Sequence, residues 1–185
     1  MRTTFNIIMK WLPLAIATAG LCGLVYLTVQ QSLRISANDP QIQLAEDAAS
    51  ALGGGANVDS IVPAARVELA ASLAPFIIVF DDSGNVLASS ATLHGSIPVY
   101  PSGVLDYARK NGEDRVTWQP ENGVRMATVV VHYDKGFVLA GRSLREVEIR
   151  ESNIEKISAI AMLAIWAATL FVITLGELVG RKRAL

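Results

Sequence analysis

The sequence predicts an α+β domain, built on one five-stranded antiparallel sheet with covering helices and flanked by two transmembrane helices. Three observations lead to this fold class. Two uncharged apolar runs lie at residues 11–29 and 157–175. Between them, short β-branched runs alternate with turn dipeptides and with capped helical segments. The chain of 185 residues is 51% hydrophobic and only 18% charged, whereas soluble domains average about 25% charge.

Each apolar run has the length of a membrane span. A helix rises about 1.5 Å per residue, so each run nearly matches a hydrocarbon core of about 30 Å. Two fully buried helices of this length would dominate so small a chain, and we therefore assign residues 11–30 and 157–178 as transmembrane helices. A cleaved signal peptide and a lipid anchor on Cys22 are the alternatives. No small-x-small cleavage site follows the first run, and Leu21 is a poor neighbour for a lipidated cysteine.

The basic residues at the two ends predict the orientation. They lie on the terminal sides of both runs: Arg2, Lys10, Arg181, Lys182 and Arg183. The positive-inside rule then makes tails 1–10 and 179–185 cytoplasmic and places residues 31–156 outside the cell (inner) membrane. This middle segment holds 11 basic and 16 acidic residues, a difference of −5, and the whole chain has a net charge of −1. Neither charge favours nucleic acid as a partner.

The middle segment opens with helical patterns. Asp39 is a suitable N-cap with Pro40 at the first helical position, and the glycines at 53–55 end this helix. A second short helix is expected over 60–72, closed before Pro75.

Five strands and one further helix follow. The strands are expected at 76–80, 86–90, 114–119, 124–133 and 136–142. The first two flank the turn Asp81-Asp82-Ser83-Gly84-Asn85, and Asn122-Gly123 separates the third strand from the fourth. A short helix over 103–110, capped by Ser102, lies between the second and third strands. This order predicts an antiparallel sheet covered by helices.

The exit from the domain carries a helix-start motif and a heptad pattern. Ser143 and Glu146 fit the capping box S-x-x-E. Two rows spaced by seven follow: Val147, Ile154, Ala161, Ala168 and Leu175, and Arg150, Ile157, Ala164, Phe171 and Leu178. Only Arg150 is polar in these rows, so they predict a helix that pairs with a second copy, making a homodimer within the lipid bilayer. We expect Arg150 either to set the register of this pairing or to hold the pairing loose enough to switch.

The residues for catalysis or metal binding are sparse. The two histidines, His94 and His132, lie 38 positions apart, and no G-x-S-x-G or phosphate-binding glycine motif is present. We therefore predict that the chain is not an enzyme, and we predict no cofactor, metal site or catalytic residue.

An anion-binding pocket is the hypothesis for the polar residues of the strands. An arginine with aromatic walls suits a small carboxylate-bearing ligand. The candidates are Arg125, Arg142, Trp118, Tyr100 and Tyr107, and we expect the ligand beneath the helix at 103–110. The other interpretation is that the arginines form surface salt bridges and the aromatic rings fill the core.

The hairpin Phe76-Ile77-Ile78-Val79-Phe80-Asp81-Asp82-Ser83-Gly84-Asn85-Val86-Leu87-Ala88-Ser89 and the segment Gly136-Phe137-Val138-Leu139-Ala140-Gly141-Arg142-Ser143 resemble the extracytoplasmic PAS-like or Cache sensor domains of bacterial membrane receptors. The resemblance implies a ligand pocket between sheet and helices and dimer-based signalling. Such receptors continue into an output module, whereas about ten residues follow the second span here. We therefore expect a separate kinase, cyclase or transporter as partner. A non-sensory accessory subunit of a membrane complex is the alternative function.

Overall fold

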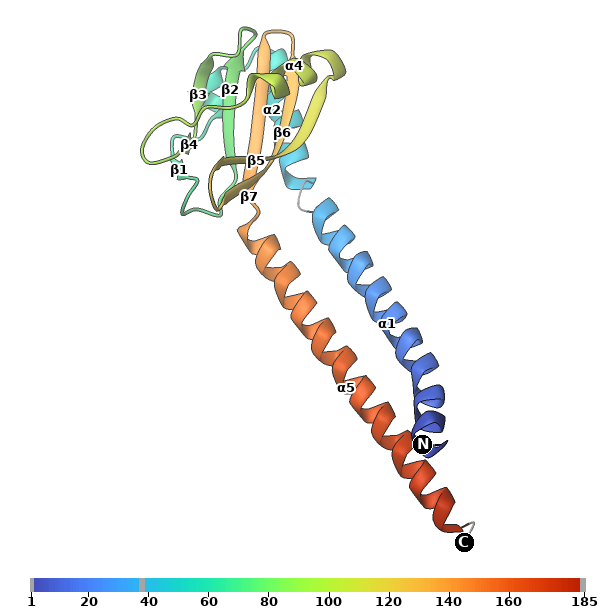
Figure 1. Cartoon of the computed structure of the whole chain (residues 1–185). Coiled ribbons are helices and arrows are strands. Elements are labelled where there is room, and N and C mark those ends of the chain that lie inside the picture. Colours follow the sequence, from blue (N-terminus) through green and yellow to red (C-terminus); the bar gives the residue numbers. More distant parts are fainter. Residues whose placement is uncertain (1, 37–38, 184–185) are drawn as a thin grey trace. The chain divides into compact units, whose positions relative to one another are not determined.

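The computed structural model describes residues 2–36 and 39–183. The chain divides into two compact units: Arg34–Glu148 forms one, and the terminal segments up to Leu33 and from Ile149 form the other. The predicted fold class is confirmed at the level of an α+β chain with a five-stranded antiparallel sheet and a long apolar helix at each end (Figure 1).

The sheet orders its strands β3-β2-β7-β6-β5. Their bounds are β2 (Phe76–Asp81), β3 (Val86–Ser89), β5 (Glu113–Glu121), β6 (Val124–Tyr133) and β7 (Gly136–Ser143). Every neighbouring pair is antiparallel. The last strand, β7, lies in the middle, between the first hairpin and the β5–β6 hairpin. A separate two-stranded sheet pairs β1 (Val67–Glu68) with β4 (Ala91–Thr92) in parallel.

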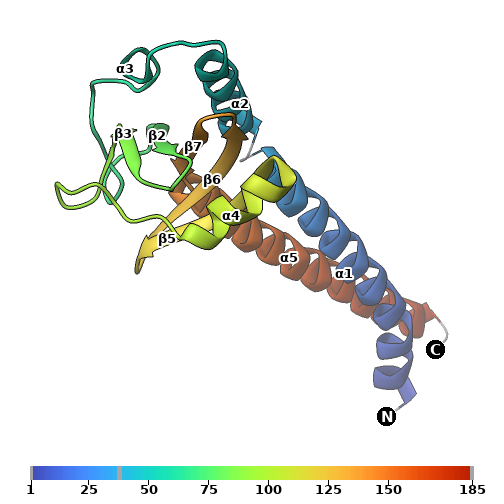
Figure 2. The same cartoon turned by 90° about the horizontal axis from the view of Figure 1, so that it is seen from above.

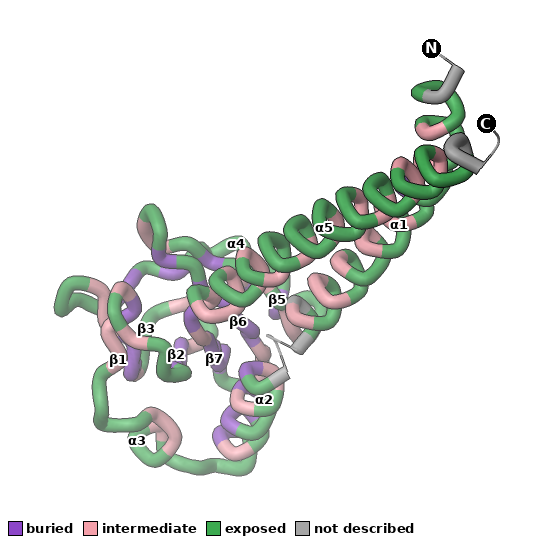
Figure 3. The backbone as a smooth tube through the Cα atoms, turned by 90° about the horizontal axis from the view of Figure 1, so that it is seen from below, coloured by how far each residue is buried: buried purple, intermediate pink, exposed green. Residues whose placement is uncertain are grey.

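Helices cover both faces of the large sheet. Leu105 and Ala108 of α4 (Ser102–Asn111) pack on one face, in a cluster with residues of β2, β6 and β7. Ala45 and Ala49 of α2 (Asp39–Gly53) pack on the other face. Figure 2 shows the sheet between these two helices, and the buried residues in Figure 3 gather on the strands and the inner side of α2. The capping side chain predicted at Asp39 lies outside the described residues.

The prediction of a helix over 60–72 is wrong. Only α3 (Val58–Ile61) is helical, and the chain then becomes extended at Val62, with φ −87° and ψ 116°. Val62 precedes Pro63, and a residue before proline is pushed out of the helical region. The prediction placed the stop at Pro75, but Pro63 ends the helix first. Val67 and Glu68 are then free to pair with β4.

The terminal unit contains α1 (Arg2–Ser36) and most of α5 (Arg145–Arg183). Both helices are long and apolar enough to cross a membrane. Within this unit the rings of Trp11 and Trp166 meet edge to face, with centroids 5.8 Å apart. The Trp11 indole donates to Thr169 Oγ1 at 3.2 Å, and Lys10 pairs with Glu177 at 2.5 Å. Ala15 is buried at this contact, where its small side chain permits close approach.

Candidate functional site: the sheet edge and the start of helix α5

The residues predicted to bind a ligand are divided between the two faces of the sheet. Val124 and Met126 belong to the cluster beneath α4, so Arg125 between them points to the opposite face. Arg142 pairs in register with Ala127, which places it on the Arg125 side. Trp118 pairs with Met126 and lies on the α4 side. The structure therefore does not assemble the predicted pocket of arginine and aromatic walls beneath α4.

The aromatic candidates on the α4 side fill the core. Tyr100 and Trp118 are buried and meet edge to face at 5.0 Å. The Thr128 hydroxyl donates to the Val116 carbonyl at 3.0 Å, so the Tyr100 hydroxyl donates to Thr128 Oγ1, 2.9 Å away. Burial raises the pKa of Tyr100 to about 12 because it disfavours the charged phenolate. Tyr107, on α4, is 54% exposed and lies outside this cluster.

The arginine candidates instead hold the first turn of α5. Arg125 of β6 pairs with Glu148 at 2.5 Å, and Arg142 of β7 pairs with Glu146 at 3.3 Å. Both pairs lie within the domain unit. The two strands at the centre of the sheet are thus each bridged to the beginning of the helix.

A third arginine, which the sequence analysis did not single out, completes this attachment. Arg145 donates to the carbonyl of Ala70 at 2.5 Å and to that of Ala71 at 3.3 Å. The Ser143 hydroxyl accepts from the Arg145 amide at 3.3 Å, which caps the helix start. Sequence could not reveal Arg145, because its partners are main-chain carbonyls more than 70 residues earlier in the chain.

The remaining residues of the predicted signal helix follow along α5 from its first turn onward. Val147 and Ile154 are half-buried, while Arg150 and Ile157 are exposed. The structure thus places Glu146 beside Arg142. The other predicted signal-helix residues are spaced along α5.

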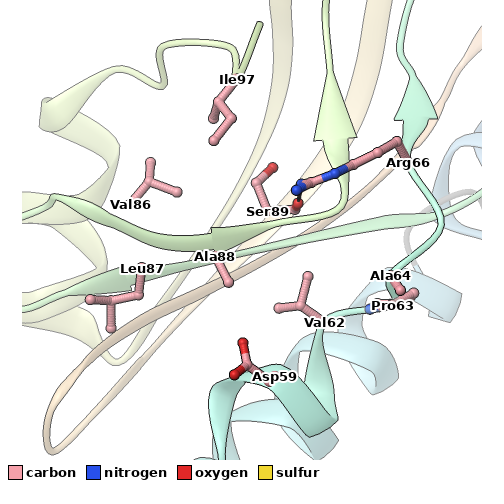
Figure 4. Close-up of a pocket in the computed structure, with 10 residues that line it drawn as sticks. All are labelled: Asp59, Val62, Pro63, Ala64, Arg66, Val86, Leu87, Ala88, Ser89 and Ile97. Carbon is pink, nitrogen blue, oxygen red and sulfur yellow. Dashed lines mark hydrogen bonds between the residues drawn. The ribbon is translucent and has the colours of Figure 1, made fainter. Parts of the chain in front are cut away.

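An open pocket of about 410 Å³ lies at the edge strand β3. Figure 4 shows Val86 and Ile97 on one side of the strand, and Asp59 and Val62 on the other. The side chain of Arg66 forms part of the pocket wall, and its guanidinium group donates to the carbonyl of Ser89. The full lining is Asp59, Val62, Pro63, Ala64, Arg66, Val86, Leu87, Ala88, Ser89 and Ile97.

Segment 62–72 links this pocket to α5. Its first part walls the pocket. Its middle is β1, where the Val67 amide donates to the Ser90 carbonyl at 2.7 Å and the Leu69 amide to the Thr92 carbonyl at 2.8 Å. Its last part is the turn whose carbonyls accept from Arg145. Segment 62–72 thus runs from the pocket wall, through β1, to the start of α5.

The loop after β4 is held by a separate group of charges. The Glu68 carboxylate accepts from the His94 amide at 3.0 Å, and this bond lowers the pKa of Glu68 most. The His94 ring bonds to Glu121 at 2.7 Å, which raises the pKa of His94. In the described residues, no set of three His, Cys, Asp or Glu side chains is placed to hold a metal ion.

No protein-family model, curated protein or solved structure matches the chain.

Proposed function

We propose that the chain is a membrane-anchored, non-enzymatic sensory protein. Its sheet domain binds a ligand or partner outside the cell membrane, and paired transmembrane helices pass the bound state to a separate output protein. The observation that carries this proposal is the attachment of α5 by Arg125, Arg142 and Arg145. These contacts join the sheet and segment 62–72 to the helix that continues into the second apolar run.

A PAS-like or Cache-like identity of the domain is part of the proposal. The hairpin at 76–89 forms β2 and β3, and the segment at 136–143 forms β7. These are the two segments that carry the sequence resemblance, and they lie side by side in the sheet. A central last strand that leads directly into the exit helix suits a sensor, because a change at the sheet must move the helix start.

The contacts at the start of α5 are of a kind that can exchange. The Arg125–Glu148 and Arg142–Glu146 pairs are about half exposed, and exposed ion pairs contribute little net stability. A switch needs two arrangements of similar free energy that a ligand can bias. Exposed pairs of this kind can be exchanged at small cost, which suits a switch at the start of α5.

Helix α5 has a side available for a second copy. The row of half-buried residues faces α1: Ser158, Met162, Trp166, Thr169, Ile173 and Glu177. At 100° per residue, the heptad rows that begin at Val147 and Arg150 lie on nearly the opposite side of the helix. Ile157 and Phe171 of these rows are 66% and 67% exposed. Packing against α1 therefore leaves the heptad side open to a partner helix.

Cysteine labelling in intact cells tests the orientation. In a Cys22→Ser background, we expect a Ser83→Cys variant, at the exposed β2–β3 turn, to react with a membrane-impermeant maleimide. A cysteine placed at Thr4, in the N-terminal tail, should react only after permeabilisation. The reverse pattern would place the domain in the cytoplasm and end the proposal of an external sensor.

Crosslinking through α5 tests the coupling. We expect single cysteines at Ile154 and Ile157 to form disulfide dimers in membranes, with yields that change when Arg145→Ala releases the helix start. Arg115→Ala is the matched control, because Arg115 pairs with Glu113 on its own strand, away from α5. Equal crosslinking in all three backgrounds would show that the domain does not act on α5 through Arg145.

A further inference from the structure

In the described residues no further strand pairs with the outer edge of β3, which the Arg66 side chain reaches at one carbonyl. β3 ends the five-stranded sheet and pairs only with β2. Next to it along the edge, β1 covers Ala91 and Thr92 by parallel pairing. Before Val67, however, the chain turns away toward α3, and the pocket lies in the space it leaves beside Val86–Ser89 (Figure 4). The pocket therefore lies where a strand in line with β1 would pair with β3.

The main chain of β3 turns hydrogen-bonding groups toward this space. Ala88 pairs with Val79 across the sheet, and the Ser90 amide donates to the Ile77 carbonyl. The Asp81 amide donates to the Asn85 carbonyl, so by alternation the main-chain groups of Val86 point outward, and those of Ser89 do so counting from Ala88. The Arg66 guanidinium already donates to the outward carbonyl of Ser89. A register shift at Leu87 marks a bulge, which limits the pairing to a short segment.

The two edges of the sheet differ in how they are protected. β5, at the opposite edge, has the sequence EDRVTWQPE. Charged side chains and proline on an edge strand discourage pairing with another chain. β3 has the sequence VLAS, without charge or proline, and Leu87 and Ile97 beside it are 53% and 48% exposed. The chemistry that blocks strand addition at β5 is therefore missing at β3.

We propose that the edge of β3 binds an extended peptide segment of a partner protein by strand addition. The segment takes about four residues, the length of β3. Its alternate side chains meet Val86 and Ile97 on one side of the strand and Val62 and Asp59 on the other. An aliphatic residue suits the first side, and a basic residue suits the Asp59 carboxylate on the second. This partner class rests on the proposed sensory function, since segment 62–72 would carry the binding event to Arg145.

Binding is tested with nine-residue peptides selected from a random displayed library against the full chain in lipid nanodiscs. The selected peptides are resynthesised, and single N-methyl groups are placed along them in turn. Strand addition predicts a two-residue period, because only alternate amides donate to β3. Each methyl group on such an amide should weaken binding by roughly tenfold, the loss of one or two main-chain hydrogen bonds. Uniform effects along the peptide would overturn the proposal.

Two substitutions at Val86 locate the site. Val86→Pro removes the outward N–H, whereas Val86→Ala shortens the side chain and keeps that donor. We expect Val86→Pro to abolish peptide binding and Val86→Ala to weaken it only partly. If no selected peptide depends on the Val86 amide or shows the two-residue period, β3 is not a peptide site. That result leaves the labelling and crosslinking tests of the sensory function unaffected, so the two proposals fail separately.

Discussion

Tyr100 is the residue whose chemistry depends most clearly on burial. Its hydroxyl donates to Thr128 Oγ1, and the low-dielectric surroundings raise its pKa to about 12, from 10.0 for the free side chain. A raised pKa in the folded state means that the native protein holds this proton more tightly than the unfolded chain does. The resulting stability is fully present below pH 10 and is lost as pH rises through the folded pKa.

Substitution of Tyr100 by phenylalanine should have two effects. The free energy of unfolding falls by about 0.5–1.5 kcal/mol at neutral pH, the usual net value of one hydrogen bond. The decline in stability between pH 10 and pH 12 becomes shallower than in the wild type, because the titrating group is gone. Urea unfolding followed by near-ultraviolet circular dichroism measures both. An unchanged slope in the alkaline range would show that another group titrates there.

His94 offers a second test at a single exposed residue. Its bond to Glu121 raises its pKa, so the contact is present below the ordinary value of 6.5 and is lost as pH rises through the raised pKa. Glu121→Gln should move the pKa of His94 back toward 6.5. An imidazole NMR titration measures this shift, with His132 as an internal reference. Identical His94 curves in the two proteins would contradict the contact.

Strand β7 is the element with the tightest steric demands. A Cβ atom at Gly141 would lie 2.3 Å from Cζ of Phe76, whereas a Cβ at Gly103 in α4 meets no atom within 4 Å. The chain approaches so closely at Gly141 because the Phe76 ring packs across the neighbouring strand.

Substitution of these two glycines by alanine should therefore change the free energy of unfolding in opposite directions. Gly141→Ala overpacks the core and lowers the free energy of unfolding by about 1–3 kcal/mol. Gly103→Ala removes a flexible residue from a helix and raises it by up to about 1 kcal/mol. Urea unfolding of both variants makes the comparison. Equal stabilities would mean that the Phe76 ring moves aside at little cost.

The turn at the end of segment 62–72 depends on helix α5 for its order. Arg145→Ala removes both donors to Ala70 and Ala71, so amide hydrogen exchange over residues 69–73 should quicken several-fold through local opening. Arg125→Ala also removes an α5 contact but touches no atom of this turn, and exchange there should stay at the wild-type rate. Equal acceleration by both substitutions would indicate a general loosening of the helix start.

For the molecule as a whole, the two sides of α5 differ in what covers them, and they should differ in whether they contact a second copy. The side with Met162 and Trp166 packs against α1 within one chain, where Trp11 and Trp166 meet. The heptad side, with Ala164 and Phe171, is exposed. Ala15 is buried at the contact of α1 with α5, so the α1 side of α5 is already packed within one chain.

Single cysteines introduced in a Cys22→Ser background should therefore give crosslinking yields that depend on which side of α5 they occupy. We expect intermolecular disulfides at Ile157, Ala164 and Phe171, and little crosslinking at Met162 and Ile173, which α1 covers. Oxidation in native membranes followed by non-reducing electrophoresis measures the yields. A protein that crosslinks equally at all five positions, or at none, does not form the proposed helix pair.

The sequence by itself determined the features that depend on near neighbours. Uncharged runs of span length predicted the long apolar helices, and turn chemistry at Asp81–Asn85 and Asn122-Gly123 predicted the hairpins. Period-two alternation along 124–133 places Arg125 and Met126 on opposite faces, as the structure has them. These features follow from interactions between residues two to four positions apart, which a single chain displays directly.

Only the tertiary structure decided which face α4 covers and what the arginines bind. Arg125 and Arg142 lie on the face opposite α4, and this position removes them from the predicted pocket. The contact of Arg145 with Ala70 and Ala71 and the parallel pairing of β1 with β4 join distant segments. Such contacts are set by strand register and helix packing across the whole domain, so no local pattern announces them.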